Sequence, residues 1–214
     1  RKAAAPICET VEAFAIVAHF GVRNPSHELQ ARDVIHEISG LPVTCGHELS
    51  AQLGGPKRAL TCVLNARLVG MIAELVDATE AILECRGILA PLMLVRGDGS
   101  LVTAEFARKR PIETILSGPA ASLIGAAHLT GLTDAIISDI GGTTTDIAVL
   151  REGRPELNPN GASVGGYQTM VEAIDMVTHG LGGDSEVWFD KKGRGDGPRL
   201  GPRRLIPVSL LSRD

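Results

Sequence analysis

Apolar positions in the first two thirds of the chain alternate between a helical spacing and short continuous runs. Intervals of three and four residues predict helices, and small or polar residues mark their ends. Ser26 is a candidate N-cap for the first helix, and Gly40 and Gly87 stand where the first two helices should end. The predicted helices are Ser26–Ser39, Lys57–Cys85, Thr103–Lys109 and Ser117–Gly131.

Continuous runs of apolar and β-branched residues between these helices predict strands. Ile88–Val95 has almost no polar interruption, which is typical of a strand buried on both faces. The other predicted strands are Val11–Val22, Pro42–Cys45, Ile112–Leu116, Thr169–Val177 and the strand-like tail Leu205–Leu211. Strands that alternate with helices indicate an α/β protein.

The most informative stretch is Ile136–Leu150, which reads IISDIGGTTTDIAVL. Two apolar, β-branched runs flank a Gly-Gly turn, so the pattern predicts a tight β-hairpin. A purely structural hairpin whose turn happens to contain two glycines is the simpler alternative. The polar residues of this turn nevertheless suggest chemistry.

Two carboxylates, Asp139 and Asp146, bracket this turn and could hold a hydrated Mg²⁺ or orient an attacking group. Glycines let a backbone approach an anion closely and direct N–H groups at it, and threonine hydroxyls add further donors. One loop therefore offers contacts for both phosphate and metal. The candidate phosphate-binding residues are Gly141, Gly142, Thr143 and Thr144.

A second glycine turn, Gly182-Gly183-Asp184, follows the last predicted strand of the α/β region. Such a turn is a weak signal by itself. If the fold brings it to the first turn, it would close over the nucleotide that the first one holds. We therefore add these three residues to the candidate nucleotide-binding set.

Composition narrows the class of protein. The 214 residues are 44% apolar and 21% charged, as in ordinary soluble domains, and the net charge is −4. A negative net charge and 3% aromatic residues argue against nucleic acid and anionic membranes as partners. We find no apolar run that would span a bilayer. The four scattered cysteines fit reduced thiols, so a cytoplasmic location is expected.

Other chemical motifs fail on inspection. The chain has neither a P-loop nor a dinucleotide fingerprint. Gly161–Gly165 matches G-x-S-x-G, but prolines and asparagines surround it instead of a strand and a helix. Three His-Glu pairs lack the second histidine that a helical zinc-protease motif requires.

The turn Asp139–Asp146 resembles the second phosphate loop of the actin, Hsp70 and sugar-kinase superfamily. Further stretches occur in the order found in one branch of it, the N-methylhydantoinase A and 5-oxoprolinase family. They are Val22–Glu28, Leu41–Thr44, Val63–Ala66, Leu116–Ala121 with Ile124–Ala127, and Gly165–Tyr167.

This resemblance implies an RNase H-like α/β fold with a mixed sheet and flanking helices. Residues 1–133 would be the remainder of a first lobe, with the long helix and a connecting helix. Residues 134–214 would be part of the second, nucleotide-binding lobe. The family further implies ATP and Mg²⁺ as cofactors, a cyclic amide such as a hydantoin or 5-oxoproline as substrate, and a hydantoinase B-type partner subunit or domain.

Three departures from the family pattern leave alternatives open. The family's first phosphate loop is missing here, so we expect the isolated chain to lack ATPase activity. Gly182-Gly183-Asp184 is closer to the Gly-Gly-acid turn of Hsp70, and the tail Gly201–Val208 is unusual. A sugar-kinase-like phosphotransferase and an Hsp70- or actin-like ATPase are the alternatives to an ATP-dependent hydrolase.

Overall fold

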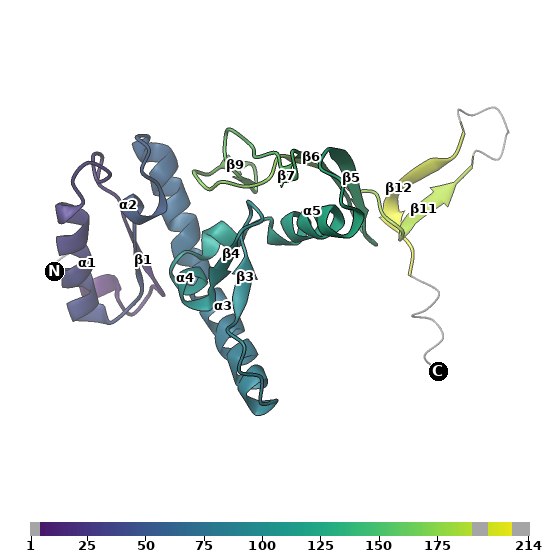
Figure 1. Cartoon of the computed structure of the whole chain (residues 1–214). Helices are drawn as coiled ribbons and strands as arrows, with labels where there is room; N and C mark the ends of the chain where they lie inside the picture. The colour runs from purple at the N-terminus through teal and green to yellow at the C-terminus, as the bar shows by residue number, and fades with distance from the viewer. Residues whose placement is uncertain (1–4, 190–196, 207–214) are drawn as a thin grey trace. The chain divides into compact units, whose positions relative to one another are not determined.

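The computed structural model describes residues 5–189 and 197–206, and these form two compact units (Figure 1). Unit 1 comprises Arg1–Ala121 and Leu157–Ile174, and unit 2 comprises Ser122–Glu156 and Asp175–Asp214. The units do not follow the predicted boundary after residue 133. Residues 157–174 return to unit 1 because they bond to its long helix: the Met170 N–H donates to Thr61 Oγ1 over 3.0 Å.

Unit 1 is built around one long helix, α3 (Gly55–Cys85). It packs on a parallel pair of strands, β1 (Phe14–Ile16) and β2 (Val43–Cys45), which α1 (Ser26–Ser39) connects. The remaining elements are η1 (Ala5–Ile7), α2 (Gly46–Leu49), β3 (Met93–Val95), β4 (Leu101–Thr103), α4 (Ala104–Lys109), η2 (Pro111–Thr114), β8 (Ser163–Val164) and β9 (Tyr167–Gln168). The buried core cluster consists of Leu49, Cys62, Ile112, Ala162, Val171 and Ala173.

The predicted helices are confirmed, including α5 (Ser117–Thr130), within one or two residues at each end. Gly40 ends α1 and Gly87 follows α3, both in the left-handed region that suits glycine, with φ of 65° and 67°. The proposed cap at Ser26 is wrong. Pro25 precedes the helix, and Asn24 Oδ1 accepts the Ser26 N–H instead.

Most predicted strands of unit 1 are shorter than expected or absent. Val11–Val22 yields only β1, because a turn follows it in which the Gly21 N–H donates to the Ala18 carbonyl. In Ile88–Val95 only β3 is extended and Leu89 is 96% exposed, since Pro91 interrupts the run and cannot donate to a ladder.

Two further strand predictions fail for the same kind of reason. Ile112–Leu116 is mostly the 3₁₀ helix η2, which Pro111 begins with its fixed φ. In Thr169–Val177 only the end is extended, as part of β10 (Met176–His179). Earlier in that run, backbone groups bond to the loop at Asn158–Ala162 instead of to a sheet.

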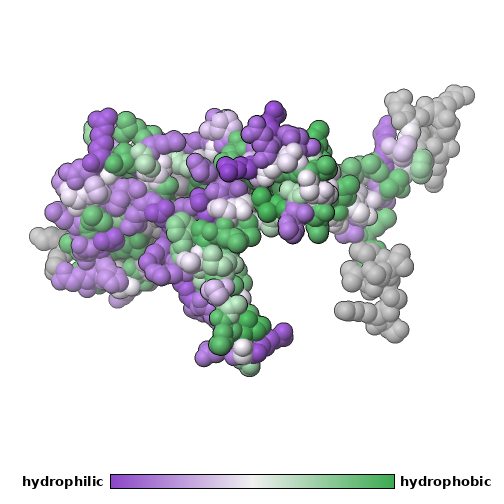
Figure 2. Space-filling view, in the orientation of Figure 1, coloured by the Kyte–Doolittle hydropathy of each residue, from purple (hydrophilic) through white to green (hydrophobic). Residues whose placement is uncertain are grey.

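The length of α3 corrects the expectation that nothing could span a bilayer. Among the described residues, α3 alone has the length and hydropathy for it. Three polar residues on this helix, Arg58, Thr61 and Asn65, are buried and hydrogen-bonded within unit 1, which is how a core helix packs. Figure 2 shows apolar surface toward the far end of α3, and in the C-terminal half of this helix Leu75 and Ile82 are more than half exposed.

Unit 2 contains the sheet that carries the predicted hairpin. Its strand order is β10 (Met176–His179), β6 (Thr145–Arg151) and β5 (Ala135–Ile140), with β7 (Arg154–Pro155) also paired to β6. A separate antiparallel pair joins β11 (Ser185–Trp188) to β12 (Arg199–Arg204). The predicted strand at Leu205–Leu211 is not extended at 205–206, and its remainder lies outside the described residues. The α/β class is confirmed.

Candidate functional site

The predicted hairpin at Ile136–Leu150 is present in unit 2. Strands β5 and β6 pair in antiparallel register over their whole lengths. The Gly141 N–H donates to the Thr144 carbonyl over 2.9 Å and closes the connecting turn. Gly141, Gly142 and Thr143 are exposed, so the turn presents its backbone at the surface.

The two candidate catalytic carboxylates face each other across this hairpin. Asp139 on β5 is the direct cross-strand partner of Asp146 on β6. Side chains in such pairs have Cβ atoms about 5 Å apart, and like charges placed there are destabilising. Thr178 on β10 donates its hydroxyl to Asp146 Oδ1 over 2.7 Å and fixes the orientation of that carboxylate. The pair is therefore a costly arrangement that a bound cation would relieve.

The second glycine turn docks on the first. The Gly183 N–H donates to the Gly141 carbonyl over 2.9 Å, and the Asp184 N–H donates to the Gly142 carbonyl over 2.8 Å. A Cβ atom placed on Gly182 would lie 2.5 Å from the Gly142 carbonyl oxygen. The two turns can approach this closely only because that position has no side chain.

The same contact brings a third carboxylate to the hairpin turn. A Cβ atom on Gly142 would lie 2.8 Å from Asp184 Oδ2, so this carboxylate rests against the exposed glycine. In the described part of the chain, no Lys, Arg or His forms an ion pair with Asp139, Asp146 or Asp184. The turn region of unit 2 thus carries uncompensated negative charge.

The donors around this charge fit a hard cation and a phosphate. Carboxylate and hydroxyl oxygens are the ligands that Mg²⁺ prefers, and nitrogen or sulfur ligands are absent from the predicted set. Within the described residues, the backbone N–H groups of Gly142 and Thr143 and the hydroxyl of Thr143 have no hydrogen-bond partner. These exposed donors can turn toward an anion. Asp139 and Asp146 are cross-strand partners beside these donors, so they are the candidate metal ligands.

The sequence analysis missed three hydroxyls that organise the site. Besides Thr178, Thr145 Oγ1 donates to the Leu181 carbonyl over 2.7 Å, and Ser185 Oγ accepts the Gly182 N–H over 3.0 Å. Both bonds tie the second turn in place. A partial signal exists, because Thr178 and Ser185 flank the Gly-rich stretch between β10 and β11. Only the strand register shows that Thr178 reaches Asp146.

Comparisons with known proteins identify the family of this chain. The family model described as hydantoinase/oxoprolinase matches residues 58–203. Caprolactamase subunit alpha of Pseudomonas jessenii is 31% identical over 91% of this chain and 28% of its own length. The acetophenone carboxylase gamma subunit of Aromatoleum aromaticum is 26% identical over 79% of this chain and 24% of its own length.

Solved structures give the same picture. The ATP-dependent caprolactamase from Pseudomonas jessenii superposes with a TM-score of 0.74 at 32% identity, over 92% of this chain and 28% of that one. A nucleotide-free acetone carboxylase, at 23% identity and a TM-score of 0.67, shares the fold. The chain thus spans little more than a quarter of these relatives. Because the family model matches more than half of its residues, the chain belongs to the hydantoinase/oxoprolinase family.

Proposed function

We propose that this chain supplies the phosphate- and metal-binding turns of an ATP-dependent enzyme that opens a cyclic amide. The observation that supports this most directly is the docking of two glycine turns next to three carboxylates in unit 2. A hairpin with only a structural role would need neither the close approach at Gly182 nor the repulsive pair Asp139 and Asp146.

The chemistry explains why such turns are needed. An unstrained amide carbonyl is resonance-stabilised, and ATP, when bound, supplies a phosphoryl group that makes its oxygen a good leaving group. Phosphoryl transfer depends mainly on positioning and charge compensation. In our proposal, Gly141, Gly142, Thr143 and Thr144 contact the β- and γ-phosphates, and Asp139 and Asp146 hold Mg²⁺. Gly182, Gly183 and Asp184 lie on the nucleotide side.

The substrate class is proposed from the relatives. The caprolactamase subunit is named for caprolactam, a cyclic amide, which supports a lactam, hydantoin or 5-oxoproline-like substrate. The carboxylase relatives favour a second candidate, ATP-driven carboxylation of a ketone. The family match does not favour the sugar-kinase or Hsp70-like alternatives.

Partner and location are proposed on similar grounds. Two relatives are named as the alpha and gamma subunits of their enzymes, which supports a partner subunit, and a hydantoinase B-type subunit is our specific proposal. A cytoplasmic location fits the net charge of −4 and the scattered cysteines.

Nucleotide binding to the 214-residue chain tests the proposal. Titration of ATP by calorimetry, with and without Mg²⁺, should show binding that requires the metal. Asp146→Asn should weaken it strongly, because one of the two metal ligands is lost. The matched control is Asp134→Asn, since this exposed residue lies just before β5 and outside the turn. Metal-independent binding, or equal losses in both variants, would contradict the assignment.

Turnover distinguishes the candidate reactions. In a full-length protein containing this chain, ATP turnover should rise with lactams or hydantoins if the enzyme is a hydrolase. Stimulation by ketones with bicarbonate, and none by cyclic amides, would favour the carboxylase. Stimulation by sugars alone would refute both.

A further inference from the structure

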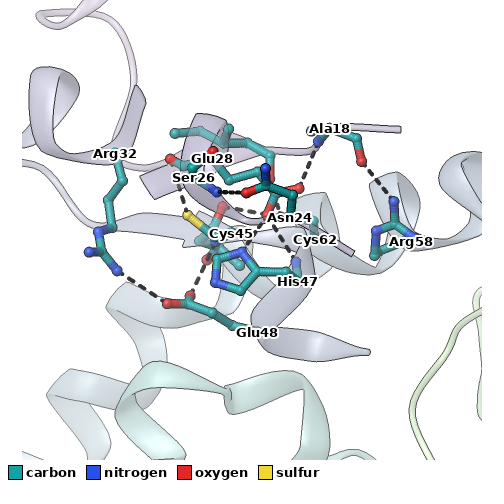
Figure 3. A network of polar contacts seen from close by, with 12 residues as sticks. Ala18, Asn24, Ser26, Glu28, Arg32, Cys45, His47, Glu48, Arg58 and Cys62 are labelled. Atoms are coloured by element: carbon teal, nitrogen blue, oxygen red, sulfur yellow. Dashed lines mark hydrogen bonds and ion pairs between the residues drawn. The ribbon is translucent and has the colours of Figure 1, made fainter. Parts of the chain in front are cut away.

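Unit 1 contains a cluster of three side chains that the proposed function does not use (Figure 3). Glu28 lies on α1, Cys45 ends β2, and His47 lies on α2. One oxygen, one sulfur and one nitrogen atom from these residues lie within 4.8 Å of one another. Three elements of unit 1 thus bring together three different metal-ligating atoms.

The carboxylate of Glu28 is held in place by the backbone. Its side chain is fully buried. The Ala18 N–H donates to Oε1 over 2.7 Å, and the His47 N–H donates to Oε2 over 3.0 Å. A Cβ atom on Gly21 would lie only 2.1 Å from Oε1, so a glycine there leaves room for the carboxylate. The ligand atom is therefore positioned before any metal arrives, as outer contacts position metal ligands in proteins.

The charge of this buried carboxylate has little compensation. In the described part of the chain, its one ion-pair partner is His47, whose Nδ1 lies 2.6 Å from Oε2 and which is cationic only when protonated. The buried Arg58 donates to the Ala18 and His19 carbonyls rather than to the carboxylate. Two backbone N–H groups, those of Ala18 and His47, donate to the two oxygens of this buried carboxylate, and such bonds favour its charged form. Buried charges in proteins are paired or coordinate metals.

We propose that Glu28 Oε2, Cys45 Sγ and His47 Nδ1 bind a borderline divalent metal of the Zn²⁺ class. Binding expels the Cys45 thiol proton to solvent and moves the proton of the neutral His47 ring from Nδ1 to Nε2. Metal then replaces that proton between Nδ1 and Oε2, while both backbone N–H groups keep their bonds to the carboxylate. One sulfur, one nitrogen and one oxygen ligand suit Zn²⁺ and exclude Mg²⁺ and Ca²⁺.

The geometry requires only side-chain adjustment. Tetrahedral Zn²⁺ with these donors has ligand atoms roughly 3.3–3.6 Å apart, so Nδ1 and Oε2 must separate by less than about 1 Å and the sulfur must approach by a similar amount. His47 also lines a cavity of about 550 Å³ together with Arg110 and Glu113. The cavity provides a route from solvent to His47.

The backbone of Cys45 is also held in place. Glu48 Oε2 accepts the Cys45 N–H over 3.3 Å, and Arg32 donates to Glu48 Oε1 over 3.3 Å. The thiol of Cys45 is free and buried. A coordinating metal deprotonates such a thiol outright. Metal uptake should therefore be accompanied by release of a proton.

Co²⁺ is the probe that tests this site, because a thiolate ligand produces a sulfur-to-cobalt charge-transfer absorption. The reduced 214-residue chain should develop this band and saturate at one Co²⁺ per chain, and added Zn²⁺ should abolish it. Cys45→Ala should remove the band. Cys85→Ala is the matched control, since Cys85 is exposed at the end of α3, and this variant should keep the band.

A second variant guards against a misfolded Cys45→Ala protein. His47→Gln keeps the thiol and should weaken Co²⁺ binding more than about 100-fold, because a ligand is lost rather than an outer contact. Circular dichroism confirms folding of each variant before titration. The proposal would be overturned if the unmodified chain never shows the charge-transfer band. It would also be overturned if the band survives Cys45→Ala, or if Cys85→Ala removes it as fully as Cys45→Ala does. Nucleotide binding by unit 2 does not enter this measurement, so either proposal can fail alone.

Discussion

Gly182→Ala is the sharpest test of the docked turns in unit 2. A Cβ atom at this position would lie 2.5 Å from the Gly142 carbonyl oxygen and 2.6 Å from the Thr143 nitrogen. Both obstacles are backbone atoms, so no side-chain rotation can relieve the clash. Ordinary contact requires the turns to separate by roughly 1 Å. That movement breaks the bonds from the Gly183 and Asp184 N–H groups to the hairpin.

The magnitude follows from those two hydrogen bonds. Each contributes about 1 kcal/mol net, so their loss favours the open turn by about 2 kcal/mol. That corresponds to a roughly 30-fold increase in amide exchange at Gly183 and Asp184. Hydrogen exchange measured by NMR reports both amides directly. The strands β5 and β6 should keep their protection, because their ladder does not involve Gly182.

Gly180→Ala provides the matched control. A Cβ atom on Gly180 meets nothing within 4 Å, and neither glycine has a φ in the left-handed region. The same substitution two residues away should therefore leave exchange at Gly183 and Asp184 unchanged. Wild-type protection in Gly182→Ala would show that the turns do not dock as described. Equal deprotection in both variants would show that the effect is loss of backbone flexibility instead.

Three further predictions concern stability and activity. Asp139→Asn should raise the free energy of unfolding by up to about 1 kcal/mol in urea denaturation, because it removes the repulsion with Asp146, and a destabilised variant would contradict this. The same substitution should weaken Mg²⁺-dependent ATP binding, because Asp139 is one of the two proposed metal ligands. Asn65→Ala should lower that free energy by about 3 kcal/mol, since its amide bonds to Thr44 Oγ1 and to the backbone of Lys109 and Ile112 would be lost in a buried site. Exposed Asn160→Ala should change it by less than about 0.5 kcal/mol. The 214-residue chain should release no phosphate from ATP, and turnover equal to that of a full-length homologue would refute the need for the family's first phosphate loop.

Local sequence was sufficient for the helices and the hairpin. The spacing of apolar residues in α3 and the glycines after α1 and α3 act within a few residues of the chain, so they can be read in order. The hairpin likewise depends on Gly141 and Gly142 between two β-branched runs. Each of these elements is specified by its own residues.

The strands of unit 1 could not be predicted because their limits are set by distant partners. The Ala18 N–H, which would continue β1, donates to the side chain of Glu28 on α1. The segment after Thr169 is held by the loop at Ala162 rather than by a sheet. An apolar run therefore indicates burial in both cases, but not an extended conformation.

The candidate site in unit 2 was predictable in its parts and not in its assembly. Asp139 and Asp146 were visible as two acids around a turn, whereas their direct opposition follows from the register. The docking of Gly182–Asp184 on Gly141 and Gly142 depends on contacts across about forty residues of intervening chain, which no local pattern encodes. Thr178 was missed for the same reason.

The two units differ in whether their polar side chains have compensating partners, and this contrast supports the proposed position of the ATP site. In unit 1, the buried Asn65 and Arg58 are anchored by several hydrogen bonds each, as expected where polarity serves packing. At the hairpin turn of unit 2, Asp139 faces Asp146, and Asp184 rests against Gly142, with no cation among the described residues to offset them. A fold gains no stability from such an arrangement. It persists where a bound metal and phosphates compensate the charge, so this costly arrangement of carboxylates is the best candidate for a functional site.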